Sequence, residues 1–244
     1  NKLINMYDKC GSLVDAREVF DAMTERDVFS WNMIIAAYRR HGFPREALSL
    51  FNQMQPTGVQ PDQFTFASIV PACAKVRALE QGTAIHQTII ERGFLSDVVV
   101  ANALIDMYAK CGSIQKARQL FDKIPERSAV SWNAIITGYA QNGVLDEALR
   151  LFQKMPRRDA VSWTAMIVGY AQNGFLDEAL RLFKVMPQPY VVSWNAVIGG
   201  YAQNGLVEEA LEIFKQMQLA GVKPTAATFG TILPACAKMG TLEQ

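Results

Sequence analysis

One repeated motif constrains this sequence more than any other feature. The tetrapeptide Ser-Trp-Asn-Ala around Trp132 returns around Trp163, with Thr for Asn, and again around Trp194, at a constant spacing of 31 residues. Each copy is followed by Tyr-Ala-Gln-Asn-Gly and then by an acidic residue, Glu, Ala and Leu, and Trp31 opens an earlier copy. A fixed period of this length indicates a solenoid or an array, in which every unit is one supersecondary element stacked on its neighbours.

The motif divides the chain into units of two lengths. We expect a single repeat tract over residues 1–244. It consists of a partial unit 1–27, units of 35 residues at 28–62, 63–97 and 191–225, units of 31 residues at 98–128, 129–159 and 160–190, and a partial unit 226–244.

Apolar residues within a unit recur at the helical period of i, i+3, i+4 and i+7. In the 129–159 unit the first stripe is Trp132, Ile135, Ile136 and Tyr139, and the second is Leu145, Ala148, Leu149, Phe152 and Met155. Gly143 separates the two helices and Pro156 ends the second. Each unit is therefore predicted to be a helical hairpin.

A single hairpin cannot bury both of its stripes, so neighbouring hairpins must stack. The predicted fold is all-α, a right-handed α-solenoid superhelix of stacked helix-turn-helix repeats, with the first helices lining a concave face. Pro71 and Pro234 fall inside the first helices of their units, where we expect a kink or a late helix start.

Net charge and hydropathy limit the partners that can be expected. The formal net charge is +1, which neither requires nor excludes a nucleic-acid partner. No apolar run reaches the roughly 18 residues of a membrane span, so we expect no membrane partner. Asn1 falls inside a repeat, so we expect the natural N-terminus to lie upstream. The absence of a targeting segment therefore says nothing about destination.

No catalytic or metal-binding pattern is present either. We expect no enzyme activity, no cofactor and no metal, because nucleophile–base spacings, phosphate loops and His/Cys clusters are absent from the sequence. Cys10 and Cys111 share one repeat slot, and Cys73 and Cys236 share another, which predicts small buried thiols.

One face of each first helix is not used for stacking. On a helical wheel Val130, Asn133 and Gln141 lie together, away from the stripe that contains Trp132. Because this face recurs from unit to unit, it forms a regular ladder of small side chains. Such a ladder suits a linear polymer that is read one element at a time.

At this point the motifs resemble a known family. Ser-Trp-Asn-Ala, Tyr-Ala-Lys-Cys-Gly-Ser and Asp-Glu-Ala-Leu-x-Leu-Phe resemble those of pentatricopeptide repeat proteins, and the mixture of unit lengths resembles the plant PLS subclass. The resemblance covers essentially the whole chain. Tetratricopeptide repeats would show a strict period of about 34 residues and a different Trp motif.

The resemblance implies recognition of single-stranded RNA at one base per repeat, read by two or three side chains. The fifth and last residues of a unit would read the base: Asn1 with Asp27, Asn32 with Asp62, Asn102 with Ser128, Asn133 with Asp159, Thr164 with Tyr190, and Asn195 with Thr225. The second residue of a unit would flank the base: Phe29, Val99, Val130, Val161 and Val192.

By the family's usual correspondences, the RNA would read roughly 5′-UUnCURYn-3′. Three positions depart from the family pattern. Ala67 and Gly230 occupy the fifth slot of their units without a polar group, and Tyr190 replaces the expected Asp or Asn, which leaves the choice between A and G open.

The thirteenth residue of each unit shares the same face and suggests a phosphate track. Its cations are Lys9, Arg40, Lys75, Lys110 and Lys238, whereas the units from 129 to 225 carry Gln141, Gln172 and Gln203. We therefore expect a track that is cationic over the first repeats and neutral further on. Ordinary surface lysines are the alternative.

The resemblance further implies the specificity part of an organellar C-to-U RNA editing or RNA processing factor, in the mitochondrion or chloroplast. Its partners would be an editing cofactor protein, or a separate or downstream deaminase domain. The His-x-Glu…Cys-x-x-Cys signature of such a deaminase does not occur in this sequence. The alternative is a protein-binding helical-repeat scaffold, because α-solenoids present their faces to peptides as well.

Overall fold

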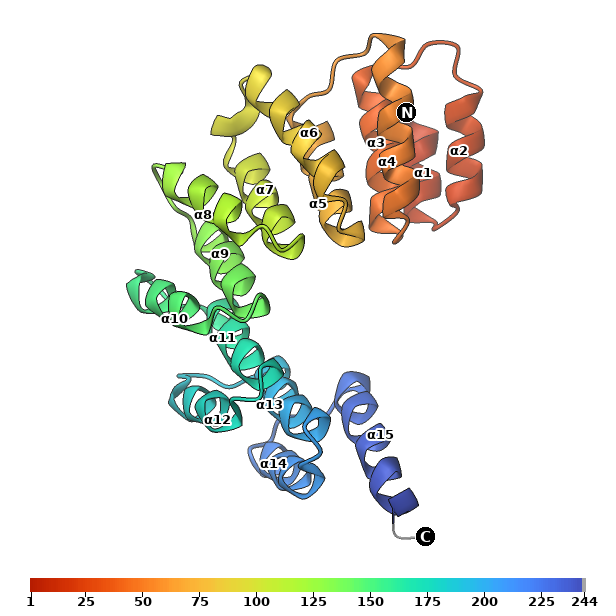
Figure 1. Cartoon of the computed structure of the whole chain (residues 1–244). Coiled ribbons are helices and arrows are strands. Elements are labelled where there is room, and N and C mark those ends of the chain that lie inside the picture. The colour runs from red at the N-terminus through yellow and green to blue at the C-terminus, as the bar shows by residue number, and fades with distance from the viewer. Residues whose placement is uncertain (243–244) are drawn as a thin grey trace. The chain divides into compact units, whose positions relative to one another are not determined.

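The computed structural model describes residues 1–242, with side chains through residue 237. The described chain is helical and contains no strand (Figure 1). Its helices are α1 (Lys2–Lys9), α2 (Leu13–Asp21), α3 (Val28–Arg40), α4 (Pro44–Met54), α5 (Gln63–Val76), α6 (Leu79–Glu91), α7 (Val98–Lys110), α8 (Ile114–Lys123), α9 (Ala129–Gln141), α10 (Leu145–Lys154), α11 (Ala160–Gln172), α12 (Leu176–Val185), α13 (Val191–Gln203), α14 (Val207–Leu219) and α15 (Ala226–Leu242). Short 3₁₀ turns follow α4 (η1, Gln55–Thr57) and α6 (η2, Phe94–Ser96).

The helices form stacked hairpins, which confirms the predicted all-α repeat solenoid. The chain comprises two compact parts, Asn1–Arg127 and Ser128–Gln244, and each is described by itself. In the first part the odd-numbered helices α1, α3, α5 and α7 pack in a row, each with its even-numbered partner. In the second part α9, α11, α13 and α15 pack in a row, and α10, α12 and α14 pair with the first three of them. The treatment of residues 1–244 as a single tract stays a prediction.

Side-chain caps fix the start of five odd-numbered helices, α3, α5, α7, α9 and α11. The carboxylate of Asp27 accepts a hydrogen bond from the Ser30 backbone N–H at 2.8 Å, and that of Asp97 accepts from Val99 and Val100 at 2.8 and 3.0 Å. Such caps satisfy N–H groups that have no partner inside the helix, and each stabilises it by about 1 kcal/mol. The last residue of one unit is thereby held at the start of the next odd-numbered helix.

The repeated tryptophan joins consecutive hairpins. Trp31 of α3 packs edge-on against Phe20 of the preceding hairpin, with ring centroids 4.7 Å apart. The same pairing recurs at 4.8 Å between Phe152 and Trp163 and at 4.6 Å between Phe183 and Trp194. Removing the two rings from water stabilises the stack by about 2–5 kcal/mol. The edge-on contact between the rings adds about 0.5–1.5 kcal/mol.

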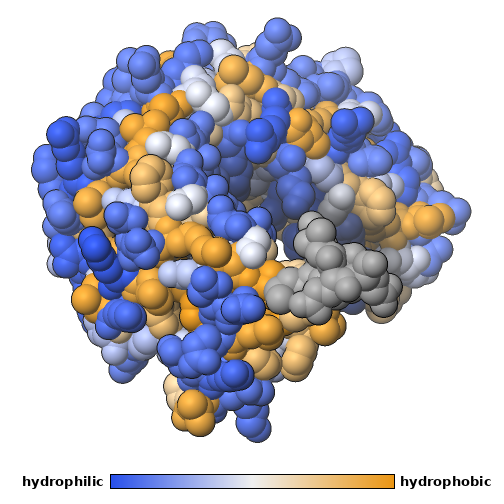
Figure 2. Space-filling view, turned by 60° about the horizontal axis from the view of Figure 1, so that its bottom comes forward, coloured by the Kyte–Doolittle hydropathy of each residue, from blue (hydrophilic) through white to orange (hydrophobic). Residues whose placement is uncertain are grey.

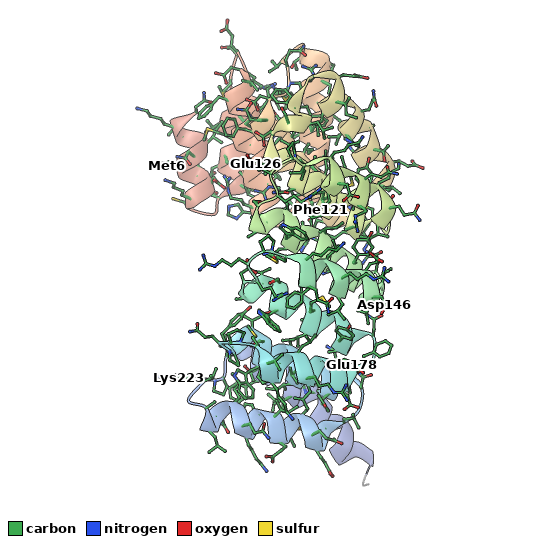
Figure 3. The ribbon with its side chains drawn as sticks, turned by 90° about the vertical axis from the view of Figure 1, so that its left-hand side faces the viewer. Met6, Phe121, Glu126, Asp146, Glu178 and Lys223 are labelled. Atoms are coloured by element: carbon green, nitrogen blue, oxygen red, sulfur yellow. The ribbon has the colours of Figure 1, made fainter. Side chains whose placement is uncertain are left out.

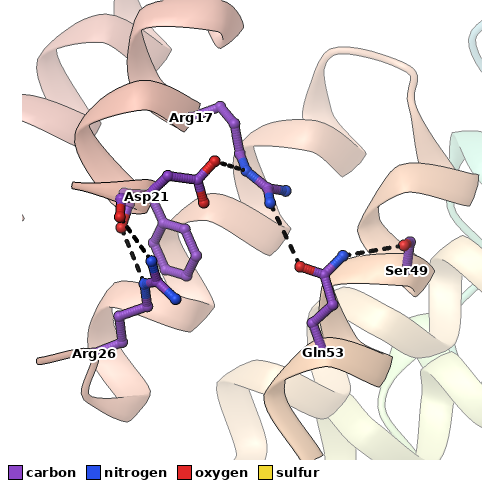
Figure 4. A network of polar contacts seen from close by, with 6 residues as sticks. Arg17, Asp21, Arg26, Ser49 and Gln53 are labelled. Atoms are coloured by element: carbon purple, nitrogen blue, oxygen red, sulfur yellow. Dashed lines mark hydrogen bonds and ion pairs between the residues drawn. The ribbon is translucent and has the colours of Figure 1, made fainter. Parts of the chain in front are cut away.

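An arginine near the end of a unit contacts the same phenylalanine. The sequence analysis did not identify this residue. The guanidinium of Arg26 lies over the Phe20 ring at 4.9 Å, and its Nε donates to the Phe20 carbonyl at 3.1 Å (Figure 4). Arg127 and Arg158 repeat both contacts with the phenylalanines of their own units. These arginines donate hydrogen bonds to backbone carbonyls at the ends of the even-numbered helices. Their recurrence at the residue before the last one of a unit could have identified them in the sequence.

Charged residues lie mainly on the even-numbered helices. In Figure 4, Arg17 of α2 bridges Asp21 and Gln53, and so connects α2 to α4. Asp146 of α10 and Glu178 of α12 lie on one side of the ribbon in Figure 3. Burial, together with these two carboxylates, raises the pKa of Tyr170. The visible face in Figure 2 mixes hydrophilic and apolar residues.

Glycine allows the odd-numbered helices of the second part to approach closely. A Cβ added at Gly169 of α11 would lie 2.6 Å from the Cβ of Ala140 on α9, and one at Gly200 would lie 2.6 Å from the Cβ of Ala171. Both values are below van der Waals contact. The spacing of neighbouring repeats there depends on these two glycines.

One expectation about the prolines is wrong. Helix α5 begins at Gln63 and runs through Pro71, so it does not start late. The Asp62 carboxylate accepts from the Phe64 and Thr65 backbones, and the Thr65 hydroxyl accepts from the Asp62 backbone. This capping box fixes the start of the helix eight residues before the proline, and the loss of one internal hydrogen bond at Pro71 does not end the helix. Pro234 likewise lies inside α15, and a kink at either proline stays a prediction.

The expectation of buried cysteines is correct only for Cys73. Burial raises the pKa of Cys73 to about 12, so its thiol is neutral at physiological pH. Cys10 is exposed, because its turn is open to solvent, and Cys111 and Cys236 are partly exposed. Within residues 1–242, no helix is both long enough and apolar enough to cross a membrane.

Candidate nucleic-acid interface

In two units the fifth and last residues meet because of the capping geometry. The fifth residue lies on one odd-numbered helix, and the last residue caps the next odd-numbered helix packed beside it. Asn32 Nδ2 donates to Asp62 Oδ1 at 2.9 Å, and Asn133 Nδ2 donates to Asp159 Oδ2 at 2.9 Å. The same amide–carboxylate pair is therefore built once in each compact part.

Hydrogen bonds lower the pKa of two aspartates among the predicted base-reading residues, Asp159 and Asp27. Burial alone would raise the pKa of Asp159, but the Ser162 backbone N–H, the Asn133 amide and the Ser162 hydroxyl outweigh it and hold that pKa below 3.8. The Ser30 backbone N–H and side chain hold the pKa of Asp27 below 3.8, with a smaller contribution from the Asn1 side chain. Both groups are acceptors at neutral pH.

The Asn32 amide has a second partner that the sequence analysis missed. Thr65, the third residue of the following unit, donates its hydroxyl hydrogen to Asn32 Oδ1 at 2.6 Å. Because Asn32 Oδ1 accepts from Thr65 and one Nδ2 hydrogen goes to Asp62, the orientation of the amide is fixed and its second Nδ2 hydrogen remains for a ligand. The signal was the hydroxyl at the third slot.

The predicted pair of Asn195 with Thr225 forms only indirectly. Asn195 Oδ1 accepts from the hydroxyl of Thr228 at 2.7 Å, whereas Thr225 Oγ1 lies 3.3 Å from Thr228 Oγ1. Thr228 occupies the same slot as Thr65. The partner in direct contact with Asn195 is therefore the third residue of the next unit.

Thr164 and Tyr190 are joined through their hydroxyls. The two oxygens lie 2.6 Å apart, and each also lies 2.8 Å from the Ala160 carbonyl oxygen. Two hydroxyl hydrogens serve these three contacts, so both are used within the triangle. Lone pairs of the two hydroxyls remain for a ligand.

Asn102 and Ser128 belong to different compact parts, so each is placed within its own part. Asn102 is buried on α7, and its Oδ1 has no hydrogen-bond partner among the described residues. Ser128 caps α9 by accepting from the Ser131 backbone N–H at 3.3 Å. Asn133 Oδ1 is likewise buried and unpaired.

The predicted flanking residues are all exposed apolar side chains that recur at one slot of the repeat. Their exposed fractions range from 50% to 65%, for Phe29, Val99, Val130, Val161 and Val192. Phe64, in the same second slot, is 64% exposed and was missing from the prediction. Its slot was the signal that could have identified it.

Two pockets are each lined by second-slot residues of two neighbouring odd-numbered helices. A pocket of about 300 Å³ in the second part is lined by Val161 and Val192 together with Thr164 and Tyr190. A pocket of about 580 Å³ in the first part is lined by Phe29 and Phe64 together with Asn32 and Asp62, and Ala67 also lines it. In each case a polar pair lies between two apolar walls.

The phosphate track is less cationic than its residue types suggest. Arg40 is paired with the buried carboxylate of Asp8, which His41 also faces at 3.1 Å, and Lys110 is paired with Asp106 at 2.7 Å. Lys9 and Lys75 are exposed. The side chain of Lys238 lies outside the described residues, and the track stays a prediction.

Comparison with known families identifies the repeat. The family model described as PPR repeat family matches residues 26–75 and 189–238, and the model described as PPR repeat matches 1–28, 99–128, 130–159 and 161–188. The chain belongs to the pentatricopeptide repeat family.

Individual relatives agree with this assignment. A chloroplastic pentatricopeptide repeat-containing protein of Arabidopsis thaliana is 46% identical over 134 residues, which is 54% of this chain and 25% of the relative. The chain spans a quarter or less of the length of the curated relatives it matches first.

The fold also matches solved pentatricopeptide repeat structures. The crystal structure of PPR10 from maize superposes with a TM-score of 0.68 at 25% identity, over 94% of this chain and 35% of PPR10. PPR10 in complex with an 18-nt psaJ RNA element gives a TM-score of 0.73 at 23% identity, over 95% of this chain and 36% of PPR10.

Proposed function

We propose that this chain binds single-stranded RNA, one base per repeat, with bases held between second-slot side chains of consecutive odd-numbered helices within each compact part. The observation that carries the proposal is the polar pair between two apolar walls, found in the pockets at Asn32 and Thr164. Family membership and the RNA complex of PPR10 support it.

The hydrogen-bonding groups of the Asn–Asp pair suit uracil. Asn32 offers one amide hydrogen, and Asp62 keeps an oxygen that accepts none of the hydrogen bonds in its cap. Uracil presents an acceptor beside a donor on its Watson–Crick edge, so both groups are satisfied. The wrong base would leave a buried group unpaired, at a cost of about 1–3 kcal/mol.

The proposed target is 5′-UUnCURYn-3′, with the units from 1–27 to 226–244 aligned in that order. The n positions correspond to Ala67 and Gly230, which bring no polar side chain to the base. The proposed reading pairs, flanking residues and phosphate contacts are those predicted from the sequence.

We further propose that the full protein belongs to the PLS subclass and serves an organellar RNA editing or processing event as its specificity part. Relatives are named chloroplastic or mitochondrial, which supports a location in one of these organelles. A cofactor protein, or a separate or downstream deaminase domain, would supply the chemistry.

The test is fluorescence anisotropy with labelled RNA of the proposed order. Replacing the U opposite Asn133 and Asp159 by a purine is expected to weaken binding about tenfold, or 1.4 kcal/mol. The matched control changes the n opposite Ala67, where less than a twofold effect is expected.

Equal losses at the two positions would refute base reading in this register and leave a nonspecific RNA binder. Absence of binding to every RNA would favour the protein-binding scaffold instead.

A further inference from the structure

Two neighbouring arginines at the end of α3 have different surroundings. Arg40 is committed to the buried carboxylate of Asp8. Arg39 has neither a hydrogen bond nor an ion pair among the described residues, and its Nε is buried without a partner. An arginine stays charged in such a place, so it carries an unsatisfied cationic group that can bind an anion.

The pocket between α3 and α5 is where this arginine lies. Asn32 and Asp62 form the polar pair of the pocket, and Phe29 and Phe64 are its apolar walls. Arg39 lines it as well, as does the paired Arg40. Arg39 follows Asn32 by seven residues, which is two helical turns. Both therefore lie on one face of α3, about 10 Å apart along the axis.

The cation is specific to this repeat. The corresponding slot holds alanine in the other complete units: Ala74, Ala109, Ala140, Ala171 and Ala202. A packing role shared by all units would not need a charge here, because the same slot in the other complete units is filled by a methyl group. The guanidinium is a group that the alanines of those units cannot supply.

We propose that Arg39 binds a phosphodiester of the RNA strand at the nucleotide whose base lies at Asn32 and Asp62. The inference rests on the proposed function. With the base between Phe29 and Phe64, the sugar and phosphate continue along the pocket toward the end of α3, where Arg39 can donate two parallel hydrogen bonds to phosphate oxygens. Arg40 is the poorer candidate, because its release would leave the Asp8 carboxylate buried and unpaired.

The experiment measures RNA affinity of the whole chain between 50 and 200 mM salt, about the range in which phosphate contacts are resolved. Arg39→Gln is expected to make the slope of log K against log salt shallower by about 0.7, the value for one neutralised phosphate of a single strand. Arg39→Lys is expected to restore the slope, because it keeps the charge. Circular dichroism spectra check that the variants fold.

Arg45→Ala is the matched control, because Arg45 is an exposed cation of α4 in the same hairpin and lies outside the pocket. Its slope is expected to equal that of the unmodified chain. An unchanged slope for Arg39→Gln, or an equal change for Arg45→Ala, would overturn this inference while RNA binding stands. Failure of the unmodified chain to bind any RNA would overturn both proposals.

Discussion

Gly169→Ala tests whether close contact between helices sets the spacing of the repeats. The new Cβ would lie 2.6 Å from the Ala140 Cβ, 3.3 Å from its Cα and 3.6 Å from its carbonyl carbon. Two of these atoms belong to the backbone, so no side-chain rotation can relieve the clash. Helix α11 must therefore move away from α9 by about 1 Å to restore normal carbon–carbon contact at about 3.5–4.0 Å.

The magnitude follows from opposing terms. Overpacking of this kind costs about 1–3 kcal/mol, while alanine gains up to about 1 kcal/mol over glycine in a helix. A net loss of about 1–2 kcal/mol lowers the melting temperature by about 2–8 °C for a chain of this size. Because Gly169 also lines the pocket at Thr164, RNA affinity should fall as well.

Urea and thermal unfolding, followed by circular dichroism, measure the effect. Gly230→Ala is the control, because it makes the same change in helix α15 at a position with no heavy atom within 4 Å. It should leave stability unchanged or raise it by up to about 1 kcal/mol. If Gly169→Ala proves as stable as Gly230→Ala, the stacking distance is not set by this contact.

Three further outcomes can be measured in the same unfolding assay. Thr65→Val leaves the Asn32 carbonyl and the Asp62 N–H without their hydroxyl partner, so it should lower the free energy of unfolding by about 1–3 kcal/mol. Thr65→Ser keeps the hydroxyl and should lower it much less, and equal losses would contradict the role of the hydroxyl. Arg77 has φ of 55° at a slot where glycine is found in other units, so Arg77→Gly should stabilise the chain by about 1 kcal/mol, and a loss of stability would show that no strain is present. The native pKa of Asp159 is lowered, so its stabilising contribution is complete above the unfolded value of about 3.9 and is lost as pH falls through the lower native value. Asp159→Asn should therefore lose less stability than the unmodified chain between pH 6 and pH 3, and identical pH profiles would refute the assignment.

The sequence was sufficient for the fold because one pattern determined several levels of structure. The apolar stripes predicted the hairpins, and the family resemblance named Asn32 with Asp62 and Asn133 with Asp159 as partners. The structure shows the physical basis of that pairing. The last residue of a unit caps the next odd-numbered helix, and this places its carboxylate beside the fifth residue of the helix before it.

Partners of individual charges could not be predicted in the same way. Arg40 was assigned to a phosphate track by its slot, but it meets Asp8, which is 32 positions away in the sequence. The slot pattern counts cations without showing which carboxylate lies opposite them. Arg39 occupies a slot that holds no cation in the other units, so the slot pattern did not indicate it. Of Arg39 and Arg40, however, it is Arg39 that has no ion-pair partner among the described residues.

Hydroxyl orientation was equally hidden. Serine and threonine at the third slot look equivalent in the sequence. Ser162 donates its hydrogen back to the Asp159 carbonyl, whereas Thr65 and Thr228 donate to the asparagine of the preceding unit. Asn133 Oδ1 thus remains unpaired while Asn32 Oδ1 is satisfied. Two asparagines at the same slot, each bonded to an aspartate, therefore do not offer a base the same groups.

Under the proposed function, residue identity alone does not assign a base to the repeat that ends at Tyr190. An Asp or Asn in that slot would offer a base its own carboxylate or amide groups. The Tyr190 hydroxyl instead reaches back to the Ala160 carbonyl and to Thr164, so both hydroxyl hydrogens are used within the protein. What remains at the pocket is a pair of acceptors, and a base must bring hydrogens to satisfy them. The base preference proposed for this repeat therefore depends on where the two hydroxyl hydrogens lie, which residue type alone does not specify.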